Sequence, residues 1–437
     1  MNRYERYKDS GIPWLGEVPE HWDTMSLKYI CDVRDGTHDT PQYVYESDNS
    51  YPLVTSKDIS NGNINFESAK FISEEDYLNI SKRSNVNFGD LLMPMIGTVG
   101  GSVLVETYRK FTIKNVALFK AGQFCAKWLK YFLDSELSKI QFELEKNGGV
   151  QDFVGLTTLR NLIILKLPLK EQTAIAHYLD TKLGEIDTLI DKQQTLLEKL
   201  AEQRTAVITH AVTKGLNPAA PMKKSGVEWL GDVPAHWNVS YLKFYYEVQL
   251  GKMLQPKSNN TDDFEISYFK AFHVQWNNIM TEELPLMWVN PRELDKYTVN
   301  NGDLLICEGG EVGRCSILRN LDGIAIIQNA VHRVRTLKNS EIRYLDYVIR
   351  HIASVGWFNI LCNKATIAHL TSEKLINLNI PIPPKDEQIN IADYLDKETV
   401  KIDRLCETVN QTIGRLKEYR TALITQVVTG KIKVTDE

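Results

Sequence analysis

The stretch KDSGIPWLGEVPEHW, from Lys8 to Trp22, returns near the middle of the chain as KKSGVEWLGDVPAHW, from Lys223 to Trp237. The second copy begins 215 residues after the first. A repeat of this length indicates an internal duplication, so the 437 residues divide into two similar halves. Each half is long enough for a core of its own, and the protein presents two related surfaces to a partner.

Two further landmarks repeat in the same order. Gly89-Asp90-Leu91-Leu92 matches Gly302-Asp303-Leu304-Leu305, each ahead of a glycine-containing loop. LPLKEQTAIAHYLDTKLGEIDTLI, from Leu167, matches IPPKDEQINIADYLDKETVKIDRL, from Ile382. Between these landmarks the match nearly vanishes. Each half is therefore a shared frame around a divergent insert, as expected if the insert carries specificity and the frame carries assembly.

The inserts, about 27–166 and 242–380, mix short β-branched and aromatic runs with turn signals such as Asn61-Gly62. This pattern predicts mostly strands with a few helices. One helix is expected at 126–132 and its counterpart at 344–349.

The stretches after Gln172 and Gln388 differ from the inserts, because their apolar residues alternate steps of three and four. This is a heptad seam on two helices of about 40 residues, or roughly 60 Å each. The seam residues are Leu183, Ile186, Ile190, Leu197, Leu200 and Val207 in the first copy and Ile402, Val409, Ile413, Leu416, Leu423 and Val427 in the second. Gly215 and Gly430 supply stop signals.

A seam this long must be covered, most simply by the other helix. An antiparallel pair with pseudo-two-fold symmetry would place the inserts at opposite ends; a parallel pair, or docking on a second protein, are the alternatives. Arg204 and Arg420 interrupt the two seams at matching positions. They are interpreted either as a register-setting or partner-contacting layer or as side chains snorkelling at the edge of the coil.

Composition narrows the class of protein. The net charge of −5 gives no overall basic footprint, so a nucleic-acid partner would need local positive charge. The polar start and the absence of an apolar run near the ~20 residues of a membrane span predict neither secretion nor membrane insertion. The six cysteines form no CxxC pair and no metal-finger spacing, which fits reduced thiols in a cytoplasm.

The sequence lacks a GxxxxGK[ST] loop and an Asn/Asp-Pro-Pro-aromatic tetrapeptide, which disfavours ATP hydrolysis and base methylation by this chain. The glycine loops at 97–101 and 308–314 are interpreted as close-approach turns for DNA or as plain tight turns rather than nucleotide loops. Glu143-Leu144-Glu145-Lys146 has no upstream acidic partner for a nuclease. His21 and His236 are expected to be aromatic clips that fasten each opening segment.

The doubled frame resembles the specificity subunits of type I restriction-modification systems. The resemblance rests on the repeated SGxxWLGxVPxHW opening, the GDLL element, and the P-x-x-EQ…YLD…ID start of a long heptad helix that ends in RTAVI or RTALI. It implies an α+β fold with two mixed target recognition domains and two helices in an antiparallel coiled coil. The expected segments are a first recognition domain at 1–167, a helix at 168–215, a second recognition domain at 216–382, and a helix with a tail at 383–437.

The resemblance also implies the function. Each recognition domain reads one half of a bipartite double-stranded DNA target, and the helices set the gap and dock two methyltransferase subunits. Restriction-translocase subunits complete the complex, which serves phage defence. This chain is then non-catalytic and binds no cofactor or metal, while S-adenosylmethionine, ATP and Mg²⁺ belong to the partners. The alternatives are a specificity subunit of a related defence system and a coiled-coil scaffold that never touches DNA.

Candidate DNA contacts lie on turn-rich stretches that carry hydrogen-bonding and basic side chains. For any one of them, an ordinary solvated loop is the alternative. The candidates are Thr37, His38, Thr40, Ser56, Lys57 and Thr98 in the first half and Lys252, Gln255, Lys257, Lys270, His273, Gln275 and Arg314 in the second.

Overall fold

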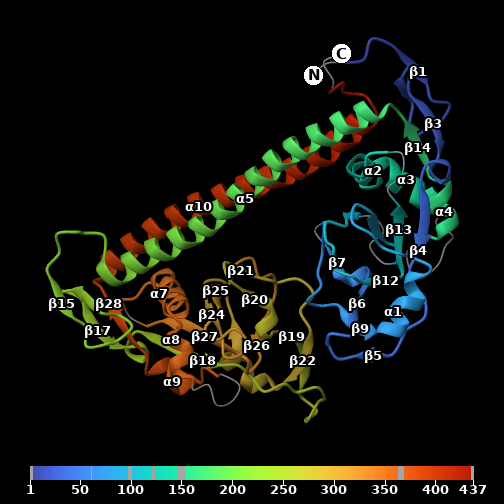
Figure 1. Cartoon of the computed structure of the whole chain (residues 1–437). Helices are drawn as coiled ribbons and strands as arrows, with labels where there is room; N and C mark the ends of the chain where they lie inside the picture. Colours follow the sequence, from blue (N-terminus) through green and yellow to red (C-terminus); the bar gives the residue numbers. More distant parts are fainter. Residues whose placement is uncertain are drawn as a thin grey trace. The chain divides into compact units, whose positions relative to one another are not determined.

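The computed structural model describes residues 3–60, 62–96, 101–120, 122, 124–144, 153–337, 339–362 and 369–434. Contacts divide the chain into two compact units (Figure 1), which are described one at a time. The first unit comprises residues 1–193 and 410–437, and the second comprises residues 194–409. The domain boundaries expected from the sequence stay a prediction, because this division cuts through both long helices.

The first unit holds two four-stranded sheets, in the orders β11-β10-β13-β4 and β12-β6-β9-β5, with a hydrophobic core between them. The unit also has the two-stranded pairs β1-β2, β3-β14 and β7-β8. The strands are β1 Tyr7–Asp9, β2 Glu17–Pro19, β3 Asp23–Ser26, β4 Asp32–Asp35, β5 Tyr43–Val44, β6 Ser50–Thr55, β7 Ile59–Ser60, β8 Asn63–Ile64, β9 Lys70–Ser73, β10 Leu91–Pro94, β11 Val103–Leu104, β12 Thr112–Lys114, β13 Val116–Lys120 and β14 Ile163–Lys166. The helices before the long helix are η1 Leu27–Tyr29, η2 Ser56–Asp58, α1 Glu74–Ser81, α2 Ala126–Leu133, α3 Glu136–Leu144 and α4 Leu156–Asn161.

The second unit has a similar plan, with sheets β18-β27-β24-β25 and β22-β19-β26-β23 and the pairs β15-β16, β17-β28 and β20-β21. The second sheets differ at one edge, because β5 pairs with β9 whereas β23 pairs with β26, the counterpart of β12. Its strands are β15 Met222–Lys224, β16 Asp232–Pro234, β17 Asn238–Tyr241, β18 Tyr246–Leu250, β19 Phe264–Phe269, β20 Val274–Gln275, β21 Asn278–Ile279, β22 Leu286–Val289, β23 Thr298–Val299, β24 Leu304–Cys307, β25 Cys315–Ile317, β26 Ala325–Ile327, β27 Val331–Thr336 and β28 Asn379–Ile382. Its shorter helices are η3 Leu242–Phe244, η4 Ala271–His273, η5 Pro291–Glu293, α6 Leu294–Tyr297, α7 Ile342–Ser354, α8 Trp357–Leu361 and α9 Ser372–Ile376.

The predicted α+β fold is confirmed, and the matching helices predicted in the inserts are α2 and α7. The two long helices are α5, Leu169–Lys214, and α10, Lys385–Val428. Each stops just before a glycine in the left-handed region, Gly215 at φ 74° and Gly430 at φ 70°.

The long helices pair antiparallel. In the first unit Arg420 of α10 meets Asp187 of α5, whereas in the second unit Asp403 of α10 meets Arg204 of α5. An earlier residue of one helix thus faces a later residue of the other, which confirms the predicted antiparallel coiled coil. The seam residues are all buried or half-buried, whereas most positions between them are exposed. Within the part of the chain that the structure describes, no helix is both long and apolar enough to cross a membrane.

Candidate nucleic-acid interface

In the first unit, the loop that follows β4 lies against the turn between β12 and β13. Gly36 makes this approach possible, because a Cβ at this position would lie 1.9 Å from the Ile113 carbonyl oxygen. The backbone N–H of Thr37 donates to the Ile113 carbonyl at 3.0 Å, and the Asn115 N–H donates to the Thr37 carbonyl at 3.1 Å. Backbone hydrogen bonds therefore join the two turns.

The same turn gathers several predicted residues. Lys114 Nζ donates to Thr40 Oγ1. His38 Nδ1 lies 2.8 Å from Asn115 Oδ1, and Ser56 Oγ donates to the Asn115 carbonyl at 3.1 Å. The cause is the parallel pairing of β12 with β6, which sets Lys114 beside Thr55 and so brings the end of one strand to the end of the other.

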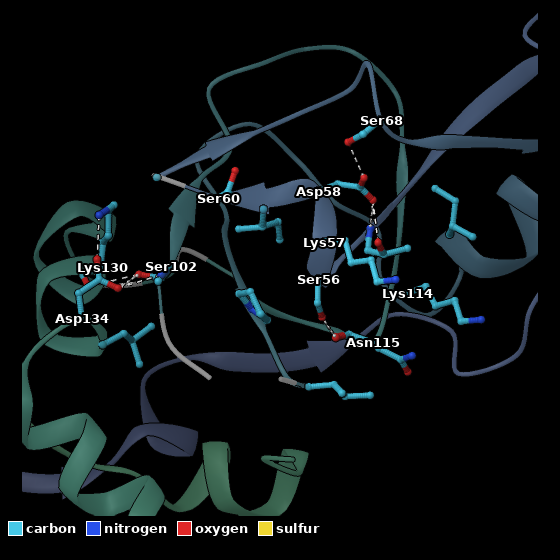
Figure 2. A pocket seen from close by; sticks show the side chains of 18 of the residues that line it. Ser56, Lys57, Asp58, Ser60, Ser68, Ser102, Lys114, Asn115, Lys130 and Asp134 are labelled. Atoms are coloured by element: carbon cyan, nitrogen blue, oxygen red, sulfur yellow. Dashed lines mark hydrogen bonds and ion pairs between the residues drawn. The ribbon is translucent and has the colours of Figure 1, made fainter. Parts of the chain in front are cut away.

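Of these residues, Ser56, Lys114 and Asn115 line a cleft of about 1450 Å³ in the first unit (Figure 2). Its basic lining residues are Lys57, Lys70, Lys114, Lys130, Lys139 and Arg420. The last three make ion pairs with Asp134, Glu136 and Asp187, respectively. Lys57 is exposed and has no ion pair with a described residue, and Lys70 lies over the Tyr43 ring at 4.4 Å. An acidic chain therefore carries local positive charge here, as an anionic partner requires.

The second unit repeats the arrangement. A Cβ on Gly251 would lie 2.2 Å from the Gln328 carbonyl oxygen. The N–H of Lys252 donates to Ile327 at 2.8 Å, and the N–H of Asn329 donates to Lys252 at 2.9 Å. The parallel pairing of β19 with β26 again brings the strand ends together.

A short 3₁₀ turn completes each set. In η2 the Asp58 carboxylate accepts from the Thr55 N–H at 2.8 Å, and in η4 His273 Nδ1 accepts from the Lys270 N–H at 3.2 Å. We call these residues the first loop cluster (36–40, 55–58 and 114–115) and the second loop cluster (251–257, 270–275 and 328–329). His273 is buried, and burial lowers its pKa, with a smaller contribution from Lys270. The buried His273 side chain therefore orders its own loop through the hydrogen bond with the Lys270 N–H.

The other predicted residues of the second unit make contacts within the unit. Lys252 Nζ lies 2.7 Å from a Glu293 carboxylate oxygen, and Gln255 Nε2 donates to Asp263 at 2.9 Å. Arg314 Nη2 donates to the Ala271 carbonyl at 2.9 Å.

Four predicted residues remain. Lys257 and Lys270 are exposed, and Gln275 donates to the Phe272 carbonyl at 2.6 Å. Thr98 lies outside the described residues. Whether any of these predicted residues contacts DNA stays a prediction.

Sequence reasoning missed the turn residues at the centre of each cluster, Lys114-Asn115 and Gln328-Asn329. A signal was present: each dipeptide follows a run that contains β-branched residues and stands shortly before the next strand, and Asn115 has φ 54°. The cleft lysines Lys70, Lys130 and Lys139 were also missed, since they come from β9, α2 and α3 and meet only in the fold.

In both units the histidine of the opening segment contacts a glutamate at the start of the long helix, so the segment is fastened there. His21 Nε2 lies 2.6 Å from Glu171, and Trp22 Nε1 donates to the same carboxylate at 2.9 Å. His236 Nε2 lies 2.8 Å from Glu387. Among the described residues, no group of three or more His, Cys, Asp or Glu is arranged to hold a metal ion.

Comparison with known proteins agrees with this geometry. The family model described as "Type I restriction modification DNA specificity domain" matches residues 19–199 and 289–415. A putative type I restriction enzyme MjaX specificity subunit of Methanocaldococcus jannaschii is 24% identical, over 96% of both chains. The EcoKI specificity subunit of Escherichia coli is 22% identical, over 95% of this chain and 90% of its own.

Solved structures share the fold. A chain from a type I restriction-modification system matches with a TM-score of 0.71 at 16% identity, over 95% of this chain and 99% of that one. The HsdS subunit of Thermoanaerobacter tengcongensis matches with a TM-score of 0.55 at 16% identity, over 95% and 98% of the two chains.

Two similar units, each with one loop cluster and a share of an antiparallel helix pair, define the class of duplicated recognition subunits. The chain belongs to the type I restriction-modification DNA specificity family, whose model covers well over half of it. Its function is that of a type I specificity subunit, as the doubled frame predicts.

Proposed function

We propose that each unit reads one half of a bipartite DNA target through its own loop cluster. One observation supports this most: the same backbone arrangement occurs twice with different side chains. In each unit a glycine lies in close contact with the backbone between two strands, beside a 3₁₀ turn. The first cluster exposes His38 and Lys57, whereas the second exposes Lys257 and Lys270. Different side chains on a common backbone suit two half-sites of different sequence.

In the first unit, we assign phosphate contacts to three cleft lysines that have no carboxylate partner among the described residues, Lys57, Lys70 and Lys114. Phosphate contacts fix the register of a protein on a duplex, and base-edge contacts then supply the specificity. Asp35 and Asn115 engage both ring nitrogens of His38, so the imidazole orders this loop and must exchange one of these partners to contact a base edge.

The long helices are proposed to dock two methyltransferase subunits. Apolar side chains outside the seam support this, because several are exposed in each unit and would be covered by a protein partner. They are Leu189 and Tyr419 in the first unit and Leu196, Tyr394, Val400 and Leu405 in the second.

Restriction-translocase subunits are proposed to complete the complex. In this proposal the chain is non-catalytic and works in the cytoplasm. S-adenosylmethionine, ATP and Mg²⁺ then act in the partner subunits and not on this chain.

The test is to co-express the chain with its cognate methyltransferase and map methylated adenines by long-read sequencing. We expect one split motif with a constant gap. Replacing residues 27–165 by the insert of a relative should change one half of the motif, and the matched replacement of 242–380 should change the other. Assembly of both partners without a split motif contradicts the proposal, and so does an exchange that changes both halves.

A further inference from the structure

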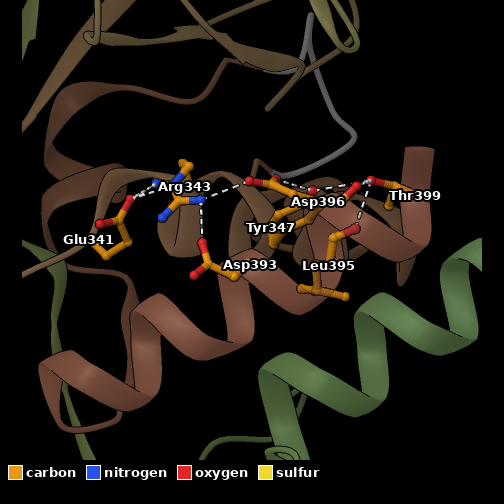
Figure 3. A network of polar contacts seen from close by, with 7 residues as sticks. All are labelled: Glu341, Arg343, Tyr347, Asp393, Leu395, Asp396 and Thr399. Atoms are coloured by element: carbon orange, nitrogen blue, oxygen red, sulfur yellow. Dashed lines mark hydrogen bonds and ion pairs between the residues drawn. The ribbon is translucent and has the colours of Figure 1, made fainter. Parts of the chain in front are cut away.

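The repeated EQ and YLD residues of the long helices make a second set of contacts, which joins each helix to the recognition body of its own unit. The first joint consists of Lys127, Tyr131 and Asp180. The second consists of Arg343, Tyr347 and Asp396 (Figure 3).

In the first joint, Tyr131 Oη donates to Asp180 Oδ1 at 2.5 Å and Lys127 Nζ donates to Oδ2 at 2.7 Å. Lys127 and Tyr131 are four residues apart on α2, so they lie on one face. Burial raises the pKa of Tyr131, with a further contribution from Asp180, so its phenol stays a neutral donor near pH 7. The Asp180 carboxylate on α5 is therefore held at both oxygens.

The second joint has the same form and more contacts. Tyr347 Oη donates to Asp396 Oδ1 at 2.7 Å, and Arg343 Nη1 donates to Oδ2 at 2.8 Å. Arg343 also donates to Asp393 at 2.7 Å, and Tyr347 Oη lies 3.3 Å from Thr399 Oγ1. After the loss of one hydrogen bond, the second joint therefore keeps more of its contacts than the first joint would.

A glutamine provides a second attachment point in each unit. Gln172 Oε1 accepts from the N–H of Cys125, the N-cap of α2, at 2.8 Å. Gln388 Oε1 accepts from the N–H of Glu341, the N-cap of α7, at 3.0 Å. Gln172 and Asp180 are two turns apart on α5, or about 12 Å at ~1.5 Å per residue. Two separated attachments prevent the rotation that either one alone would allow.

We infer that the two tyrosines are positioning residues, which fix the angle between each recognition body and its end of the helix pair and so fix the gap between half-sites. This inference rests on the proposed function. The phenols are suited to positioning because their hydroxyls contact the long helix, while neighbours such as Trp128 and Phe132 form the buried core. Removing a hydroxyl leaves that core unchanged.

The experiment uses the full chain with its methyltransferase and compares Tyr131→Phe, Tyr347→Phe and a matched control, Tyr178→Phe. Tyr178 lies on α5, half-buried, and its phenol has no hydrogen bond with a described residue. The readout is methylation at sites that keep both half-site sequences but have a gap one base pair shorter or longer.

We expect Tyr131→Phe to raise methylation at the altered gaps about tenfold relative to the native gap, since a hydrogen bond to a charged group is lost. Tyr347→Phe should have a smaller effect, because Arg343 still bridges two carboxylates. Tyr178→Phe should behave as wild type. An equal loss of methylation at all gaps, or a gap profile in Tyr131→Phe that equals wild type, overturns the inference. Absence of any split motif in wild type would instead count against the proposed function.

Discussion

The two loop clusters share a backbone but differ in how their polar side chains are engaged. In the first cluster Lys57 is exposed and makes no ion pair within the described part of the chain. In the second, Lys252 pairs with Glu293 and Gln255 donates to Asp263. The backbone is therefore set by glycines and parallel strands, and the side chains can vary without disturbing it. This explains how divergent inserts keep one architecture.

The difference also affects the cost of binding. Asp263 accepts from the N–H groups of Asn259 and Asn260 and from the side chains of Asn290 and Gln255, and the first of these contributes most to holding its pKa at about 2. The loop at 255–263 of the second unit is thus ordered before a partner arrives. The exposed lysines, Lys57 in the first cluster and Lys257 and Lys270 in the second, must still lose freedom on binding, which reduces the net affinity gained.

The largest expected effect tests the shared backbone. Gly36→Ala and Gly251→Ala should each lower the free energy of unfolding by about 3 kcal/mol or more, because the new Cβ meets a backbone carbonyl that cannot rotate away. Denaturant unfolding of the full chain, monitored by fluorescence, measures this. Gly184→Ala is the control, since nothing lies within 4 Å of its Cβ position and alanine favours the helix. If Gly36→Ala and Gly251→Ala have the same free energy of unfolding as Gly184→Ala, the two glycines do not hold the clusters.

These glycines also show what the sequence could and could not predict. Periodicity predicted α5, α10 and their seam, because heptad spacing is a local signal. It did not show that the inserts share a backbone, since Gly36-Thr37 and Gly251-Lys252 keep only the glycine. Lys114 and Gln328 depend on parallel pairing with strands far away in sequence, which no local pattern reveals. Likewise, the burial of His273 could not be predicted by comparing the two halves, because the equivalent position in the first half holds Asp58 and not a histidine.

A second expected effect separates the units by pH. Burial lowers the pKa of His351 in the second unit to about 4, whereas Ser135 stands at the matching place in the first. In the unfolded chain this histidine takes up a proton as the pH falls through about 6.5, but in the folded chain it stays neutral until about pH 4. Neutral His351 therefore makes its full contribution to the stability of the fold above pH 6.5, and this contribution is lost as the pH falls from 6.5 to 4. The second unit should lose about 2–3 kcal/mol in this range.

Amide hydrogen exchange at pH 7 and pH 4.5, corrected for intrinsic rates, resolves the two units in one sample. Protection should fall more in the core strands of the second unit than in those of the first. His351→Gln is the matched variant, because an amide can keep the hydrogen bond with Thr209 and does not titrate. Equal loss in both units, unchanged by the variant, contradicts this assignment.

The smallest expected effect concerns a feature that the units share, the ion pairs Arg420–Asp187 and Arg204–Asp403. They join the two helices, which favours the register interpretation of these arginines over simple snorkelling.

Because all four side chains are partly exposed, each pair should contribute about 0.5–1 kcal/mol. Asp403→Arg should lower the thermal midpoint through repulsion with Arg204, and the double variant Arg204→Asp, Asp403→Arg should recover most of the loss. The same exchange at Asp187 and Arg420 should behave alike, since the pairs stand at equivalent positions. If neither double variant recovers stability, the arginines do not set the register. If only one of them does, the contrast between the units extends from the loop clusters to the helices.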